Sequence, residues 1–382
     1  MFELTPSVAW ARRKFAKELP LYYDALATRL ESVKGKPMYE IFSDDAQRYA
    51  VDEEGNHKPS ARSVLSAYWA ERLPEVGGDL AKAFEGTVPR EDLTLIRLGQ
   101  SMGNDALPST FKDMARISGL IQRAKSLFMG TTAVAILAAA IVLVTLVATP
   151  TVTAPLLKSL YLGMPTEYYP ASANRLFALA DALNAILLVL LLAIAGLAYF
   201  VAWSLPNLTG PLRKKLDRRF IWRLYRDFKG ALFLATLATM TKPRGTGSNT
   251  LEQALSQMQE GSTPYVAWHI ETMLANISSV PRNATLRARE EGSVNALNTG
   301  LIDIDSFFYL MDVNQGSGLE TGLLKAGARV EGPTLAMVEA RAKLFSRTLL
   351  AAAFAAMVGW AYLHISTSKD FGAAMRNYYQ SK

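Results

Sequence analysis

Side chains that could do chemistry are few in this sequence and lie far apart. The chain of 382 residues has no cysteine, which excludes disulfides, thiol catalysis and cysteine-ligated metal sites. Its three histidines are His57, His269 and His364, and none has the i, i+4 spacing of a zinc-binding helix. We interpret them as structural or surface residues. The sequence therefore predicts no catalytic residue, no metal ligand and no cofactor.

Two short patterns resemble ligand sites only in part. The run Gly316-x-Gly318-x-x-x-Gly322 is one residue off the dinucleotide-binding spacing, and no strand precedes it, so a turn between helices explains it better. The pair Asp303-x-Asp305 is typical of a calcium loop. An EF-hand would need glycine at the sixth position of that loop and an acidic residue at the twelfth, and the sequence has phenylalanine and asparagine there. An irregular ion site remains an open alternative.

Basic charge is placed beside apolar segments. The chain has 41 Lys and Arg against 34 Asp and Glu, a net charge of +7. Next to a membrane helix, such a cluster favours an orienting or anionic-lipid role over nucleic-acid binding. The cluster after the second apolar run contains Arg213, Lys214, Lys215, Arg218 and Arg219.

The stretch Trp10–Lys17 mixes aromatic and basic residues. It has two open interpretations. One is an amphipathic anchor that lies on the inner leaflet, and the other is a solvated first helix.

Three apolar runs are long enough to cross a bilayer, which takes about 20 residues. They cover residues 128–148, 183–203 and 346–365, the last being apolar from Thr348 onward. The apolar parts contain no Asp, Glu, Lys or Arg, which argues against an ion-coupled transporter. The sequence therefore predicts three transmembrane helices.

Charge on the flanks predicts the orientation of these helices, because cytoplasmic loops are enriched in Lys and Arg. Basic residues precede the first run, follow the second and precede the third, and no signal peptide pattern opens the sequence. We expect an inner-membrane protein with a cytoplasmic N-terminus. Residues 1–127 and 204–345 would be cytoplasmic, and the loop 149–182 and the tail 366–382 periplasmic.

Internal matches indicate that the two cytoplasmic segments are copies of one domain. Arg123-Ala124-Lys125 recurs as Arg341-Ala342-Lys343, each just before an apolar run, and other pairs follow in the same order. The polar stretch Ser43–Arg62 is interpreted as an insertion in the first copy. Thr110 and Asp113 suggest a helix start. Helical periodicity without alternating strands predicts an all-α fold: two repeated cytoplasmic helical-bundle domains plus three transmembrane helices.

This order of parts resembles the inner-membrane platform proteins of type IV pili and type II secretion systems, the F-domain family. The resemblance covers nearly the whole chain. The family signature Gly-Glu-x-Ser-Gly is similar to the segments Leu98–Asn104 and Asn314–Leu319, although both have Gln where the family has Glu. A family-type metal site that uses that carboxylate is therefore not expected. The matching turn residues, to which we assign a structural role, are Gly99, Gln100, Gly103, Gln315, Gly316 and Gly318.

The resemblance implies a divergent, non-catalytic scaffold that oligomerises with its own kind. Its partners would be a cytoplasmic assembly ATPase, pilins or pseudopilins, other inner-membrane assembly proteins and membrane lipids, with no nucleic acid. Two alternatives from other classes are a small membrane transporter or exporter subunit, and a membrane-bound enzyme. The uncharged spans speak against the transporter and the lack of convergent reactive side chains against the enzyme.

Overall fold

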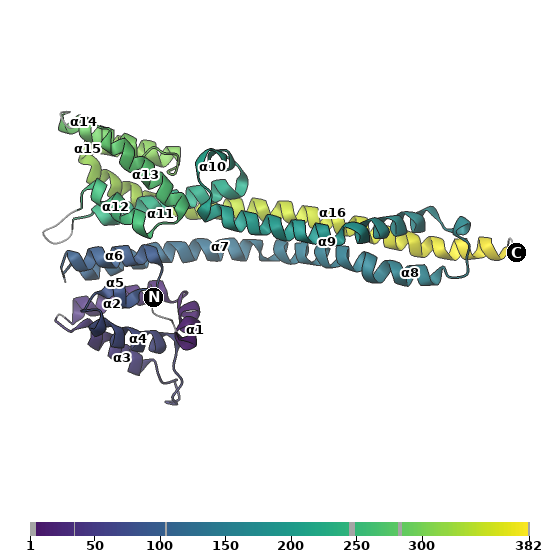
Figure 1. The fold of residues 1–382 in the computed structure, drawn as a ribbon, viewed down its shortest axis with the longest axis horizontal. Helices are drawn as coiled ribbons and strands as arrows, with labels where there is room; N and C mark the ends of the chain where they lie inside the picture. The colour runs from purple at the N-terminus through teal and green to yellow at the C-terminus, as the bar shows by residue number, and fades with distance from the viewer. Residues whose placement is uncertain (1–4, 34, 104, 244–248, 282–284, 381–382) are drawn as a thin grey trace. The chain divides into compact units, whose positions relative to one another are not determined.

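The described part of the chain is built from helices (Figure 1). The computed structural model describes residues 5–33, 35–103, 105–243, 249–281 and 285–380. Within these residues, β-type pairing is limited to one isolated antiparallel bridge between Val51 and His57. The expected all-α class is confirmed. Residues 1–4 of the expected first domain and 381–382 of the expected tail lie outside the described residues.

In the part of the chain that the structure describes, six helices precede the first long apolar helix. They are α1 (Pro6–Phe15), α2 (Leu19–Ser32), α3 (Met38–Arg48), α4 (Ala61–Glu75), α5 (Leu80–Phe84) and α6 (Arg90–Ser101).

The segment between the second and third long helices also consists of helices in the described residues. They are α10 (Gly210–Leu216), α11 (Phe220–Thr241), α12 (Leu251–Gly261), α13 (Pro264–Ser278), α14 (Leu286–Ala296) and α15 (Ile304–Arg329). This segment and the one before the first long helix are called the two soluble segments below.

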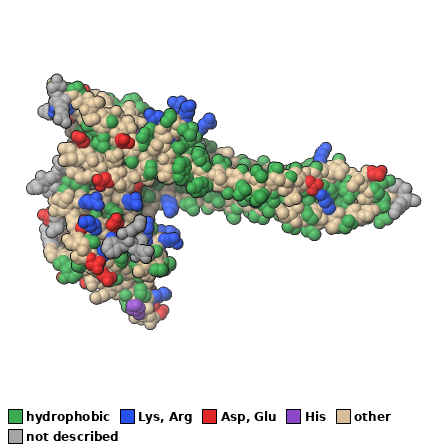
Figure 2. All heavy atoms as spheres, viewed as in Figure 1, with side chains coloured by type: hydrophobic (Ala, Val, Ile, Leu, Met, Phe, Trp, Pro, Cys, Tyr) green, Lys and Arg blue, Asp and Glu red, His purple; other side chains and the backbone are tan. Residues whose placement is uncertain are grey.

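Among the described residues, three helices are long and apolar enough to cross a membrane, as the hydropathy of the sequence predicts. They are α7 (Ala106–Ala148), α9 (Ala171–Asn207) and α16 (Glu331–Gln380). Each extends well beyond its apolar run, because the polar flanks are also good helix formers. A π-helical segment (Thr149–Thr153), α8 (Ala154–Leu160) and a 3₁₀ turn (Thr166–Tyr168) connect α7 to α9. Figure 2 shows hydrophobic side chains over the visible surface of the apolar helices.

Local signals explain several helix starts. The Thr250 side chain accepts from the Gln253 amide, and the Gln253 side chain accepts from the Thr250 amide, which together form a capping box on α12. Asp303 caps α15 through the Ser306 amide. The start suggested by Thr110 is wrong. That residue lies inside α7, where its hydroxyl donates to the Ala106 carbonyl at 2.8 Å.

The described chain divides into two compact units. One contains Met1–Lys125 and Leu205–Met337, and the other contains Ser126–Ser204 and Val338–Lys382. The two soluble segments therefore belong to the same unit. In the first segment, Trp69 lies at the centre of the core. Its ring packs within 6 Å of the rings of Phe15, Tyr22, Phe42 and Phe84, at centroid distances of 5.9, 5.4, 5.7 and 4.7 Å.

Contacts between the two soluble segments are partly ionic. The Lys229 ammonium lies 3.0 Å from a Glu91 carboxylate oxygen, which joins α11 to α6. A glycine at the end of α12 permits its close approach to α6. A Cβ at Gly261 would lie 2.9 Å from the Thr94 hydroxyl and 3.1 Å from the Arg90 carbonyl oxygen. The interface thus requires a residue without a side chain at this point.

The unit that contains the apolar helices has its own small aromatic core. Tyr161, in the connection between α7 and α9, packs on Phe177 of α9 and Phe371 of α16, at 5.8 and 4.9 Å between ring centroids. A polar contact also joins α16 to the π-helical segment, because Trp360 Nε1 donates to the Thr149 hydroxyl at 2.9 Å. These contacts tie the expected periplasmic loop to the C-terminal part of α16.

Candidate functional site

The first motif lies at the end of α6, which contains Gly99 and Gln100, and continues to Gly103 in the turn before α7. A Cβ at Gly99 would lie 2.7 Å from the Thr110 hydroxyl, so glycine lets the two helices touch. Gly103 has φ of +96°, a left-handed conformation that favours glycine. The two glycines therefore have steric roles in the turn.

Gln100 holds this turn to the loop before α5. Its Nε2 donates to the Gly78 carbonyl at 2.7 Å, and its Oε1 accepts from the Leu80 amide at 3.0 Å. A glutamine can do both, whereas an ionised glutamate can only accept. The Gln that departs from the family signature is therefore the residue type that fits these two partners.

The second motif turn has a different geometry. Gly318 (φ +80°, ψ 164°) interrupts the helical backbone of α15. Gln315, Gly316 and Gly318 line a cavity of about 290 Å³ together with Asn314 and two glutamates of α14, Glu290 and Glu291. Asn314 is 6% exposed, and its Oδ1 has no hydrogen-bond partner in the described part of the chain. The structure thus brings the residues of each motif together locally but gives Gln100 and Gln315 different surroundings.

The basic cluster after α9 is only partly on the surface. Lys214, Lys215, Arg218 and Arg219 are exposed, whereas Arg213 is 0% exposed. The Arg213 guanidinium lies 2.9 Å from an Asp217 carboxylate oxygen. Four residues of the expected cluster therefore lie on the surface, and Arg213 has a role inside the domain.

Aromatic rings enclose this buried ion pair. The Arg213 guanidinium lies over the Tyr265 ring, 4.0 Å from its centre, and the Tyr265 hydroxyl donates to Asp217 at 3.1 Å. Burial raises the pKa of Asp217 even though Arg213 acts in the opposite direction. The network of Arg213, Asp217 and Tyr265 anchors α10 to α13. None of these three side chains is a histidine, serine or cysteine that could act as a nucleophile.

His269 lies beside this network and is buried. Its Nδ1 is 2.9 Å from the Thr299 hydroxyl, and burial, reinforced by the charges of Lys214, Arg213 and Arg226, lowers its pKa to about 4. The ring is therefore neutral at pH 7, which agrees with its interpretation as a structural histidine.

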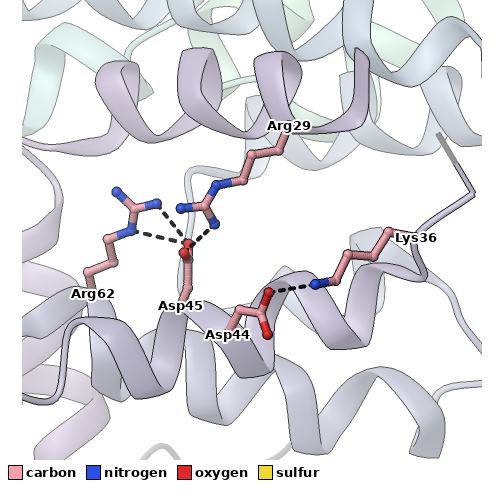
Figure 3. A network of polar contacts seen from close by, with 5 residues as sticks. All are labelled: Arg29, Lys36, Asp44, Asp45 and Arg62. Carbon is pink, nitrogen blue, oxygen red and sulfur yellow. Dashed lines mark hydrogen bonds and ion pairs between the residues drawn. The ribbon is translucent and has the colours of Figure 1, made fainter. Parts of the chain in front are cut away.

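A second buried network escaped the sequence analysis. Asp45 of α3 is 0% exposed and accepts hydrogen bonds from Arg29 of α2 and Arg62 of α4 (Figure 3). Asp44, its neighbour, faces outward and pairs with Lys36 at 2.6 Å, and this hydrogen bond lowers the pKa of Asp44. The stretch predicted as an insertion, Ser43–Arg62, thus contributes a buried residue that ties three helices together.

Metal ligands do not converge in the described residues. No group of three or more His, Cys, Asp or Glu side chains there is placed to hold a metal ion. Asp303 and Asp305 both line a cavity of about 270 Å³, with Asp227 and Arg329 among its other lining residues. Asp303 already caps α15, and Asp227 is paired with Arg226 at 2.6 Å.

No protein-family model, curated protein or solved structure matches the chain.

Proposed function

We propose that the chain is a non-catalytic platform in a bacterial inner membrane. It would couple a cytoplasmic assembly ATPase to the polymerisation of pilins or pseudopilins, in type IV pilus biogenesis or type II secretion. One observation carries the proposal. Two helices, α7 and α16, each run without a linker from a soluble, polar segment into an apolar segment long enough to cross a membrane.

A continuous helix transmits displacement better than a flexible linker does. An ATPase that works in the cytoplasm and a fibre that grows on the other side of the membrane need such a mechanical connection. The soluble unit would receive the ATPase, and the apolar helices would contact the pilin helices and further copies of the chain.

The orientation of the helices is part of the proposal. Lys214, Lys215, Arg218 and Arg219 remain exposed just beyond α9, as an orienting cluster on the cytoplasmic side would require. The soluble unit and the N-terminus would then be cytoplasmic. The aromatic core around Tyr161 and Phe371 would be periplasmic.

The order of helices supports an origin by duplication, which stays a prediction. In both soluble segments a short helix (α1, α10) precedes a longer one (α2, α11), and two helices of medium length follow. Each segment also has a left-handed glycine, Gly103 or Gly318, before the last helical stretch.

The coupling helix can be tested directly. Insertion of two glycines between Lys125 and Ser126 should make the middle of α7 flexible, because each glycine weakens a helix by about 1 kcal/mol. A matched insertion of two glycines is made beside Gly163, which already has φ of +92° in a turn. It should leave both the soluble unit and α7 intact. We expect normal protein levels for both variants and loss of fibre assembly for the first alone. Normal fibres with the α7 insertion would overturn mechanical coupling through this helix.

The class of function needs separate experiments. Deletion of the gene should abolish fibres while pilins still accumulate in the membrane. The purified chain should bind the ATPase and hydrolyse no nucleotide. Solute flux through proteoliposomes of the purified chain would favour the transporter alternative, and nucleotide hydrolysis by the chain alone would contradict a scaffold.

A further inference from the structure

The outer face of α1 combines an exposed aromatic ring with basic side chains. Residues 5–17 contain four basic residues and no acidic one. Trp10, Arg13 and Lys14 have the i, i+3 and i+4 spacing of one helix face. Lys17 follows in the turn after α1, and all four residues are exposed. Trp10 is 51% exposed, and the Lys14 ammonium lies 5.1 Å from the centre of its ring. We call these four residues the α1 patch.

The opposite face of α1 is buried in the soluble unit. Val8, Ala11 and Phe15 are part of the hydrophobic core. An amphipathic helix that lies in the membrane surface would have to turn these residues toward lipid. The interpretation of Trp10–Lys17 as an anchor inserted by its apolar face therefore does not hold, and the exposed patch is the face available for binding.

The end of α1 is fixed beside the helix that enters the membrane. Gln122 of α7 donates from Nε2 to the Ala16 carbonyl at 2.6 Å, and a Cβ at Gly119 would be 4.0 Å from Pro20. The first apolar run begins at Phe128, only six residues after Gln122. Six residues reach at most about 20 Å even when fully extended, so the α1–α2 turn lies close to the membrane surface once α7 is inserted.

We propose that the α1 patch docks on the anionic phospholipid headgroups of the leaflet into which the first span inserts. Lysine and arginine bind phosphate groups, and tryptophan prefers the interface between headgroups and acyl chains. Leu21, which is 75% exposed at the start of α2, adds apolar surface next to the turn. This docking requires only that α7 spans a membrane and does not depend on the platform function.

The absence of native cysteine allows a clean test with the full chain. Ser7 is exposed and lies one turn before Trp10, so a fluorophore on Ser7→Cys would report on the patch. The protein is reconstituted into vesicles of phosphatidylcholine, with or without phosphatidylglycerol, that carry a nitroxide quencher on the lipid headgroup. We expect strong quenching in the anionic vesicles, weak quenching in the zwitterionic ones, and relief by salt.

Paired variants identify the residues that bind. R13Q/K14Q removes two charges of the patch and should weaken docking by about thirtyfold, since each basic residue contributes about five- to sixfold. R48Q/K58Q removes two exposed charges elsewhere in the same unit and should quench like the parent protein. W10A should reduce quenching with an unchanged unfolding midpoint, which separates lost docking from lost folding. Equal quenching in both vesicle types, or none in either, would overturn lipid docking and leave an acidic protein partner as the occupant.

Discussion

The Tyr23 hydroxyl donates a hydrogen bond of 2.8 Å to Oδ2 of Asp92, and both side chains are buried. Asp92 also lines a cavity of about 50 Å³ between the two soluble segments, together with Glu91 and Lys229. Lys229 is paired with Glu91, the residue before Asp92, at 3.0 Å. Asp92 therefore has a neutral hydrogen-bond donor as its partner, which does not compensate a negative charge fully.

Asp92 should make the fold less stable as pH rises. Burial raises the pKa of Asp92 from 3.8 to about 7 despite the bond from Tyr23. Between about pH 4 and pH 7 the unfolded chain releases this proton and the folded chain keeps it, so the free energy of unfolding falls by up to about 1.4 kcal/mol per pH unit. Asp92→Asn keeps the acceptor for Tyr23 and removes the titration. Unfolding by denaturant over this pH range should therefore show the free energy of unfolding of the variant rising relative to that of the parent as pH rises.

His269 should act in the opposite direction. Its pKa in the folded chain is about 4, below the ordinary 6.5, so the unfolded chain binds a proton first as pH falls. The free energy of unfolding then decreases from about pH 6.5 down to about pH 4. His269→Asn, which can still bond Thr299, should remove this loss and expose the Asp92 slope. A flat profile in this variant and a flat profile in Asp92→Asn would contradict both assignments.

Gln100 should be sensitive to a change as small as amide to carboxylate. Gln100→Glu retains an acceptor for the Leu80 amide but places a negative charge against the Gly78 carbonyl. Loss of one hydrogen bond with an unsatisfied partner costs about 1–3 kcal/mol. We expect a lower unfolding midpoint, partly recovered at acidic pH where the new side chain is protonated. Gln47→Glu, the same change at an exposed position of α3, is the matched control.

Sequence analysis predicted the helical class and the three apolar helices because long uncharged runs are a strong and local signal. It missed the burial of Asp45 because Asp44 and Asp45 look alike in sequence. Only the helical spacing from Ile41 and Phe42, both buried, places Asp45 on the inner face of α3. The opposite error occurred at Arg213, which a run of basic residues placed on the surface. Its burial depends on Tyr265, about fifty residues away, and such pairing cannot be read from local pattern.

Gly230 should be indispensable for the packing of α11. A Cβ at this position would lie 2.2 Å from the Leu301 carbonyl oxygen, which belongs to the backbone and cannot rotate away. Gly230→Ala should therefore destabilise the soluble unit by about 1–3 kcal/mol or more, as overpacking does. Gly332→Ala, in α16 and with open space around it, should be neutral or stabilising by up to about 1 kcal/mol. Thermal unfolding of both variants in detergent measures the difference, and equal midpoints would be inconsistent with this contact.

Orientation in the membrane can be measured by cysteine labelling of intact cells, because the parent has no cysteine to give background. Glu167 is exposed in the connection between α7 and α9, and Ser256 is exposed on α12. Since α9 separates these two positions in the chain and is long and apolar enough to cross a membrane, they should lie on opposite sides. The basic residues beyond α9 predict which side is which, so Glu167→Cys should react with an impermeant maleimide and Ser256→Cys should react only after lysis. Reaction of Ser256→Cys in intact cells would reverse the orientation, and reaction of both would remove α9 as a span.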